Sequence, residues 1–144
     1  MKSIYFFVVF VLCLTFNCVS QQRYLEKEVT MDHDTMFLKK DMHKLSGIVY
    51  NEYGEIGFFK NGLREGIHKE WFRNGNLKDE ISYSNGLKDG EFRYWDTSGQ
   101  LLKEGHYFKN NLDGFIKEWY HNGNIKLEVH YKNGEMHGLR TEWY

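Results

Sequence analysis

The sequence lacks several features that mark common classes of protein. It has no proline and only two cysteines among its 144 residues. Both cysteines, Cys13 and Cys18, lie near the amino terminus, so the rest of the chain has no internal disulfide to form, even in an oxidising compartment. The stability of that remainder must therefore come from packing.

An excess of charge of either sign is also missing. The chain carries 19 basic and 20 acidic side chains, which gives a formal net charge of -1. Such a balance produces no broad positive field, and it argues against nucleic acid as the main ligand. The sequence also has no nucleophile arrangement of Ser, Cys or His, no phosphate-binding glycine loop and no cofactor motif. We therefore predict a protein that is not an enzyme and that uses no cofactor.

The apolar run from Ile4 to Phe16 is shorter than the roughly 20 residues that a membrane-spanning helix needs. The run follows a short positive start, Met1-Lys2-Ser3, and the two together are typical of a secretory signal over residues 1–20. We expect export to the periplasm or the extracellular space, with cleavage after Ser20. The alternatives are a lipoprotein anchored through Cys18 and an uncleaved anchor.

Aromatic residues are abundant, at 17%, and so is glycine, with 14 residues. Without proline, this mixture suits strands joined by glycine and asparagine turns better than helices. The four tryptophans, Trp71, Trp95, Trp119 and Trp143, are evenly spaced along the chain. A fixed period of this length is the signature of a repeat protein, in which each unit buries its apolar face against its neighbours.

Six further columns keep the period of the tryptophans. They are Gly66, Gly90, Gly114 and Gly138; Tyr83, Tyr107 and Tyr131; Gly62, Gly86, Asn110 and Gly134; Glu80, Glu104 and Glu128; Leu77, Leu101 and Ile125; and Gly75, Gly99 and Gly123.

One unit consists of a strand from Gly66 to Phe72, a turn at Asn74-Gly75, a strand from Leu77 to Tyr83, and a second turn at Asn85-Gly86. Two short strands with Asn-Gly between them are the strongest short-range signal of a β-hairpin, because both turn residues tolerate positive φ. The sequence therefore predicts an all-β fold, an elongated single-sheet array of antiparallel β-hairpins with roughly eight to ten strands.

Alternation along a strand predicts which side chains share a face of this sheet. Ile67, Lys69 and Trp71 are expected on one face, and His68 and Glu70 on the other. A two-strand unit advances roughly 10 Å. The tryptophan and tyrosine columns are therefore expected to form continuous aromatic rows.

The two ends of the predicted array differ from its middle. Residues 21–44 are polar and weakly patterned, so we interpret them as a tether or a first strand, and residues 45–144 as the repeat domain with a degraded first unit. The last unit stops at Trp143-Tyr144 after one strand. An exposed edge strand invites pairing, so we expect it to join a second copy or a partner.

The run from Lys60 to Gly66, followed by Glu70-Trp71-Phe72 and then Asn74-Gly75-Asn76-Leu77, resembles the MORN-repeat variant family. The likeness extends over about residues 47–144 and implies a sheet of 24-residue MORN-like repeats. Members of this variant are often labelled as antitoxins of a YwqK-like kind. Related repeats are thought to act as membrane-associated or protein-scaffolding modules. The predicted export signal departs from a cytoplasmic, toxin-neutralising role.

The aromatic columns are the candidate surface for a ligand or partner. Rows of flat rings with polar tips suit stacking on a sugar chain or a lipid headgroup, and they equally suit the packing face of a repeat sheet. The candidates are Trp71, Trp95, Trp119, Trp143, Tyr83, Tyr107 and Tyr131.

The seven histidines raise the possibility of a metal site. Its best candidate ligands would be Asp32-His33-Asp34 and the pair His106 and His130. A structural zinc site needs four ligands of defined geometry, and one column here offers at most two histidines. We therefore predict no metal site.

The column of Glu80, Glu104 and Glu128 places similar carboxylates in similar surroundings, whereas an acid–base pair needs different ones. We interpret the column as cross-strand ion pairs with neighbours such as Lys78 and Lys126.

These observations favour an exported, non-enzymatic repeat module for protein–protein recognition or scaffolding. An antitoxin-like role is implied only by the family resemblance. The alternative is a module that binds a glycan or a lipid surface of the cell envelope.

Overall fold

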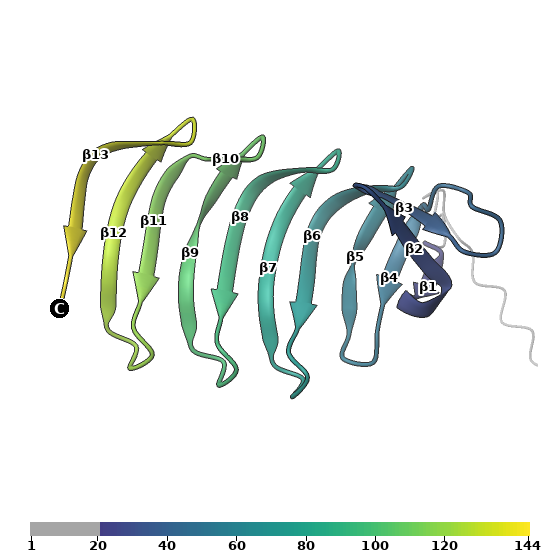
Figure 1. Ribbon diagram of the computed structural model, residues 1–144, viewed down its shortest axis with the longest axis horizontal. Helices are drawn as coiled ribbons and strands as arrows, with labels where there is room; N and C mark the ends of the chain where they lie inside the picture. Colours follow the sequence, from purple (N-terminus) through teal and green to yellow (C-terminus); the bar gives the residue numbers. More distant parts are fainter. Residues whose placement is uncertain (1–20) are drawn as a thin grey trace, which may run out of the picture.

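The computed structural model describes residues 21–144, so the predicted signal over residues 1–20 and the anchor at Cys18 lie outside the described residues. One sheet of 11 strands runs the length of the molecule, and a two-stranded sheet lies at its amino-terminal end (Figure 1). The predicted all-β, elongated sheet is confirmed, with one strand more than the upper bound of the expected range.

The amino-terminal elements are β1 (Arg23–Leu25), the 3-10 helix η1 (Glu26–Glu28), β2 (Val29–Asp32), β3 (Thr35–Leu38), β4 (Gly47–Tyr50) and β5 (Glu55–Lys60). The repeats supply β6 (Leu63–Trp71), β7 (Leu77–Ser84), β8 (Leu87–Trp95), β9 (Leu101–Phe108), β10 (Asn111–Leu112), β11 (Gly114–Trp119), β12 (Ile125–Lys132) and β13 (Glu135–Glu142). Strands pair in chain order from β4 to β13, apart from β10, which pairs only with β9. These pairs are antiparallel, whereas β1 pairs with β4 in parallel.

Tight two-residue turns join the strands at one end of each hairpin. They lie at residues 61–62, 85–86, 109–110 and 133–134. At Asn85 and Gly86 the φ angles are 49° and 83°. The type I′ hairpin turn requires positive φ at both positions, which explains the Asn-Gly preference. Where the third turn lacks glycine, Asn110 takes a φ of 70°, because asparagine tolerates left-handed geometry better than most residues.

Wider turns join the strands at their other ends, directly after Trp71, Trp95 and Trp119. The Phe72 amide donates to the Asn76 carbonyl at 2.8 Å, and only Gly75 within this loop has positive φ, at 86°. The expectation of positive φ at Asn74 was therefore wrong. The wider loop comes with a register shift between Glu70 and Trp71, and equivalent shifts accompany the tryptophans of the next two units.

The glycine column that precedes the tryptophans bends the strands. Gly66, Gly90, Gly114 and Gly138 have φ angles of 74°, 114°, 100° and 90°. An L-residue with a side chain rarely adopts these angles, so glycine permits the irregularity. Figure 1 shows β6, β8 and β13 bending near their first residues.

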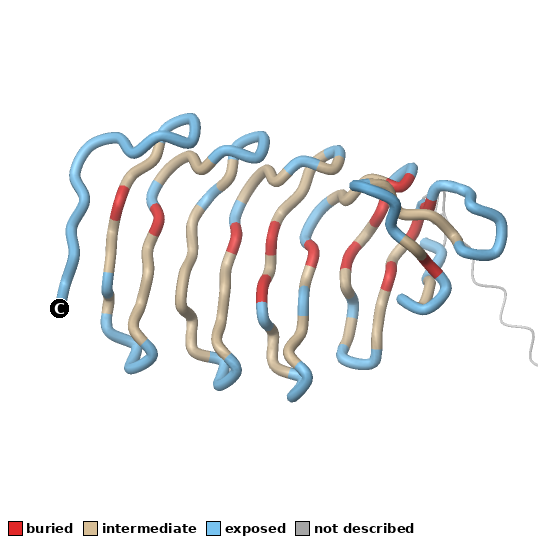
Figure 2. The backbone as a smooth tube through the Cα atoms, viewed as in Figure 1, coloured by how far each residue is buried: buried red, intermediate tan, exposed pale blue. Residues whose placement is uncertain are grey.

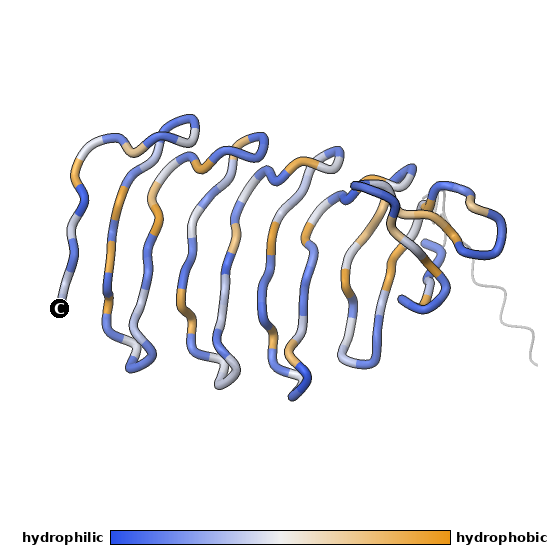
Figure 3. The backbone as a smooth tube through the Cα atoms, viewed as in Figure 1, coloured by the Kyte–Doolittle hydropathy of each residue, from blue (hydrophilic) through white to orange (hydrophobic). Residues whose placement is uncertain are grey.

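In the repeats, the buried residues lie in the strands and most turn residues are exposed and hydrophilic, although Gly62 in the first tight turn is buried (Figures 2 and 3). One cluster, at the amino-terminal end, packs the hairpin of β2 and β3 against β4 and β5; it contains Val29, Leu45, Val49 and Phe59. A second cluster follows the repeats and contains Ile81, Phe92, Ile116 and Val129. We call the face that carries both clusters the core face.

The repeat core combines two columns, each of which follows the period of the repeat. The first is His68, Phe92 and Ile116, and the second is Ile81, Gly105 and Val129, with each pair matched across neighbouring strands. The largest residue, Phe92, faces the smallest, Gly105. A Cβ at Gly105 would lie 2.3 Å from Ile116 Cδ1 and 2.9 Å from the Phe92 ring. The Phe92 ring and the Ile116 side chain therefore occupy the space that a side chain at position 105 would need.

We predict that Gly105→Val destabilises the fold by about 1–3 kcal/mol, because the added methyl groups overfill a packed site. Urea denaturation of the purified protein measures the change in free energy of unfolding. Combining it with Ile116→Ala, which opens space at the same point, should give a loss smaller than the sum of the two single variants. Strict additivity would contradict the proposed steric competition.

Candidate functional site

The face opposite the core carries a row of alternating charges on β6, β7, β8, β9, β11 and β12. Register pairs connect Lys69 to Glu80, Glu80 to Arg93, Arg93 to Glu104, Glu104 to Lys117, and Lys117 to Glu128. We call this row the charge ladder. All of these pairs except Glu104 with Lys117 form ion pairs, with nitrogen–oxygen distances of 3.7, 3.5, 3.8 and 3.7 Å along the row.

The charge ladder confirms cross-strand ion pairs for the glutamate column but changes their partners. Glu80 lies beside Lys69 and Arg93, not Lys78, which instead contacts Glu70 at 2.7 Å. The residue directly opposite on the next strand decides the pairing, and sequence neighbours do not. Because opposite charges favour one alignment, the ladder supports the register of the sheet, although each exposed pair contributes little.

The core face is hollowed between the amino-terminal hairpin and strands β4 to β8. This hollow has a volume of about 620 Å³. Its walls include Met31 and Met36 from the hairpin, and Trp71, Tyr83 and Tyr94 from the repeats. It is an open concavity that combines aromatic rings with many charged groups, and its concave shape makes it a candidate binding site.

His68 lies in the wall of the hollow and is the most deeply buried titratable base of the described residues, with 6% of its surface exposed. Its ring lies edge-on between Phe59 and Tyr83, at centroid distances of 4.9 and 5.2 Å. The neutral ring donates from Nε2 to the Phe58 carbonyl at 2.8 Å. Burial lowers the pKa of His68 to about 4, because the charged form would lose its hydration.

Asp79 and Tyr94 are register partners in the same wall. Burial raises the pKa of the Asp79 carboxyl, and the nearby Glu70 charge raises it further. Burial also raises the pKa of the Tyr94 hydroxyl, with a further contribution from Tyr107. The wall of the hollow therefore favours uncharged forms at its buried groups.

The tyrosine column lies half-buried on the core face. Tyr83, Tyr107 and Tyr131 pair with the column glycines of the neighbouring strands and pack against the second cluster. Arg64 lies over the Tyr83 ring at 5.3 Å, and Lys88 lies over the Tyr107 ring at 5.0 Å. The column is thus a packing surface whose outer side is covered by cations in two units.

The tryptophan column lies at the strand ends beside the wider turns. A Cβ at Gly54 would lie 2.9 Å from Trp71, so this ring lies against the turn of the preceding hairpin. Trp71, Trp95 and Trp119 are partly buried, and Trp143 is 39% exposed. Among residues 21–144, none of the close aromatic pairs involves a tryptophan. Tryptophans of successive units are expected roughly 10 Å apart, too far for such close pairs, so the continuous tryptophan row stays a prediction.

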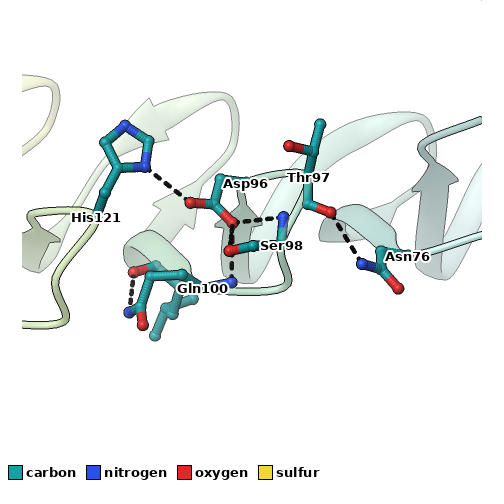
Figure 4. Close-up of polar contacts among 7 residues, drawn as sticks. Asn76, Asp96, Thr97, Ser98, Gln100 and His121 are labelled. Carbon is teal, nitrogen blue, oxygen red and sulfur yellow. Dashed lines mark hydrogen bonds and ion pairs between the residues drawn. The ribbon is translucent and has the colours of Figure 1, made fainter. Parts of the chain in front are cut away.

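Polar side chains link the wider turns to one another (Figure 4). Asp96 accepts hydrogen bonds from the Ser98 hydroxyl at 2.6 Å and from the Ser98 and Gln100 amides within its own loop. Its second oxygen lies 2.8 Å from His121 Nδ1 in the next loop. The bonds from Ser98 and His121 hold the pKa of Asp96 well below its usual range. Asn76 extends the link by donating to the Thr97 carbonyl at 2.9 Å.

The histidines and acidic residues stay dispersed over the sheet. In the part of the chain that the structure describes, no group of three or more His, Cys, Asp or Glu side chains is placed to hold a metal ion. His130 lies beside Phe115 and His137, at ring-centroid distances of 4.9 and 6.0 Å. None of the helices in residues 21–144 has the length and apolar character needed to cross a membrane.

Sequence reasoning missed the most important residues of the hollow. His68 occupies the position that Phe92 and Ile116 hold in the following units, and this column would have marked it as buried. Arg64 and Lys88 are likewise one repeat period apart. No sequence signal indicates that the amino-terminal hairpin folds over the sheet and makes one wall of the site.

The comparisons agree with the repeat unit. A family model described as "MORN repeat variant" matches residues 64–85, 88–110 and 112–133. These three segments run from β6 to β12, and each contains one wide turn and ends within a tight turn. None of the curated proteins and none of the solved structures that were compared matches the chain.

We predict that the free energy of unfolding falls by about 2 kcal/mol between pH 7 and pH 5 because of His68. The unfolded imidazole binds a proton near pH 6.5, whereas the folded one does so only near pH 4. Acid therefore favours the unfolded chain in this window. Urea denaturation at both pH values measures the effect. His68→Phe should remove most of this pH dependence, and exposed His106→Gln should leave it unchanged; equal dependence in all three proteins would contradict the assignment.

Proposed function

We propose that this chain, whose three central repeats match the MORN repeat variant, is a non-catalytic module that binds a polypeptide partner in the hollow of its core face. MORN repeat domains are generally binding modules rather than enzymes. The observation that carries the proposal is the hollow itself, about 620 Å³ in volume and lined by aromatic, aliphatic and charged side chains.

The amino-terminal hairpin supports a polypeptide as the occupant. Its residues Val29, Met36 and Leu38 pack on the core face against Val49 and Phe59. This end of the face therefore already accepts an extended segment through apolar side chains. The hollow begins where the hairpin ends and continues over β6, β7 and β8. A second extended segment would meet the same kind of surface there.

We place this activity outside the cytoplasm, on the strength of the predicted signal over residues 1–20. This placement favours recognition or scaffolding in the cell envelope over a cytoplasmic antitoxin-like role. The competing function is the binding of a glycan or lipid surface, which the exposed parts of the tyrosine column would serve.

Site-directed photocrosslinking tests the proposal. A photoreactive phenylalanine analogue replaces Tyr94 in the hollow, and in a second protein it replaces Phe115, which is 61% exposed on the opposite face. After irradiation with an extract of the native source, we expect a discrete crosslinked protein from position 94. Both positions are aromatic, so folding and labelling are comparable.

Two results would count against the proposal. Crosslinks from position 115 with none from position 94 would place the partner on the opposite face. Retention of the unlabelled protein on lipid vesicles, or on a cell-wall polysaccharide, with no protein crosslink at either position would favour the competing function.

A further inference from the structure

Two cations of the hollow, Arg64 and Lys88, form no ion pair within residues 21–144. Of the other basic residues in its walls, Lys78 lies 2.7 Å from Glu70, and the Lys69 side chain belongs to the charge ladder on the opposite face, where it lies 3.7 Å from Glu80. Across residues 21–144, neither Arg64 nor Lys88 has a carboxylate within ion-pair distance. These two cations are therefore available to an anionic ligand.

The same two cations are held in place by tyrosine rings. Arg64 lies 5.3 Å from the centre of the Tyr83 ring, and Lys88 lies 5.0 Å from that of Tyr107. A cation over an aromatic face is attracted to the ring, and Arg64 Nη2 also lies 3.5 Å from Met31 Sδ. Each pair thus presents a fixed positive group rather than a freely moving one.

The repeat sets the spacing between these cations. Arg64 and Lys88 begin successive units on β6 and β8, two strands apart, which corresponds to roughly 10 Å. The equivalent residue of the third unit is Leu112, which packs against the second cluster. The cationic positions are therefore confined to the end of the array that contains the hollow.

Three carboxylates also line the hollow, and they differ in pairing and exposure. Glu70 is bound to Lys78, and Asp79 has only 9% of its surface exposed. Glu26, in η1, is the remaining lining carboxylate, and it is exposed. Two cations outside ion pairs, Arg64 and Lys88, therefore share the hollow with two carboxylates outside ion pairs, and the buried Asp79 lies within electrostatic reach of Lys88.

We infer that the polypeptide bound in the hollow is acidic there, with carboxylates two to four residues apart that contact Arg64 and Lys88. An extended chain rises about 3.3 Å per residue, so this separation matches the roughly 10 Å between the two cations. Apolar side chains between the carboxylates would contact Met31, Met36 and Trp71 in the walls. This inference rests on the proposed function and names the chemistry of the partner.

Fluorescence anisotropy with three labelled ten-residue peptides tests the inference. The peptides alternate valine with glutamate, glutamine or lysine. We expect the glutamate peptide to bind at least tenfold more tightly than the glutamine peptide, and the lysine peptide not to bind. Added salt should weaken the binding of the glutamate peptide, because the contacts are charged and partly exposed.

Variants identify the site of binding. Arg64→Gln combined with Lys88→Gln should weaken binding of the glutamate peptide at least fivefold, whereas Arg64→Lys, which keeps the charge, should retain most of it. The matched control is Lys109→Gln, since Lys109 also lies over a ring, that of Phe108 at 5.2 Å, but does not line the hollow. Glu26→Gln should strengthen binding.

The outcomes separate the two proposals. If the glutamine peptide binds as tightly as the glutamate peptide, or if the double variant with unchanged circular dichroism binds normally, the acidic partner is ruled out while a polypeptide site at Tyr94 still stands. If no peptide binds and position 94 gives no crosslink, both proposals fail. If only phosphatidylserine vesicles bind, and the double variant loses them, the anion belongs to a lipid surface and the peptide inference is overturned.

Discussion

The sheet depends on the contact between the residue at the centre of each long strand and the residue paired with it on the next strand. These pairs are His68 with Ile81, Phe92 with Gly105, and Ile116 with Val129. Beyond the amino-terminal hairpin, none of the described residues forms a second layer over the core face, so neighbouring strands of the repeats must cover one another. Phe92 and Ile116 are each only 1% exposed because the small residue between them, Gly105, leaves room for both.

The other regular features follow from maintaining this contact through successive units. Tight turns at one end of the strands and wider turns at the other end bring equivalent strand positions into register. The charge ladder on the opposite face of the sheet favours the same alignment. The hollow forms where the pattern changes. There the amino-terminal hairpin covers only the first strands, and a histidine replaces the apolar residue of the core column.

The sequence predicted the parts of the structure that follow from local chemistry. Asn-Gly pairs located the tight turns, since few residues adopt positive φ at two successive positions. Strict alternation failed near Trp71, because the register shift before it is a property of the wider turn and not of the strand. The partners of Glu80 were also misassigned, because cross-strand neighbours are set by register and are far apart in the sequence.

The repeat period by itself determined that this protein is an array of β-hairpins, because each unit repeats the same turn chemistry and the same strand pattern. Only the tertiary structure decided which repeated residues meet. It placed the His68 ring edge-on to Tyr83 and closed one side of the hollow with residues of β2 and β3. Within residues 21–144 it also left Arg64 and Lys88 outside ion pairs and beside tyrosine rings. The physical reason is that a period fixes equivalence between units, whereas a binding site arises from differences between them and from contacts between distant segments.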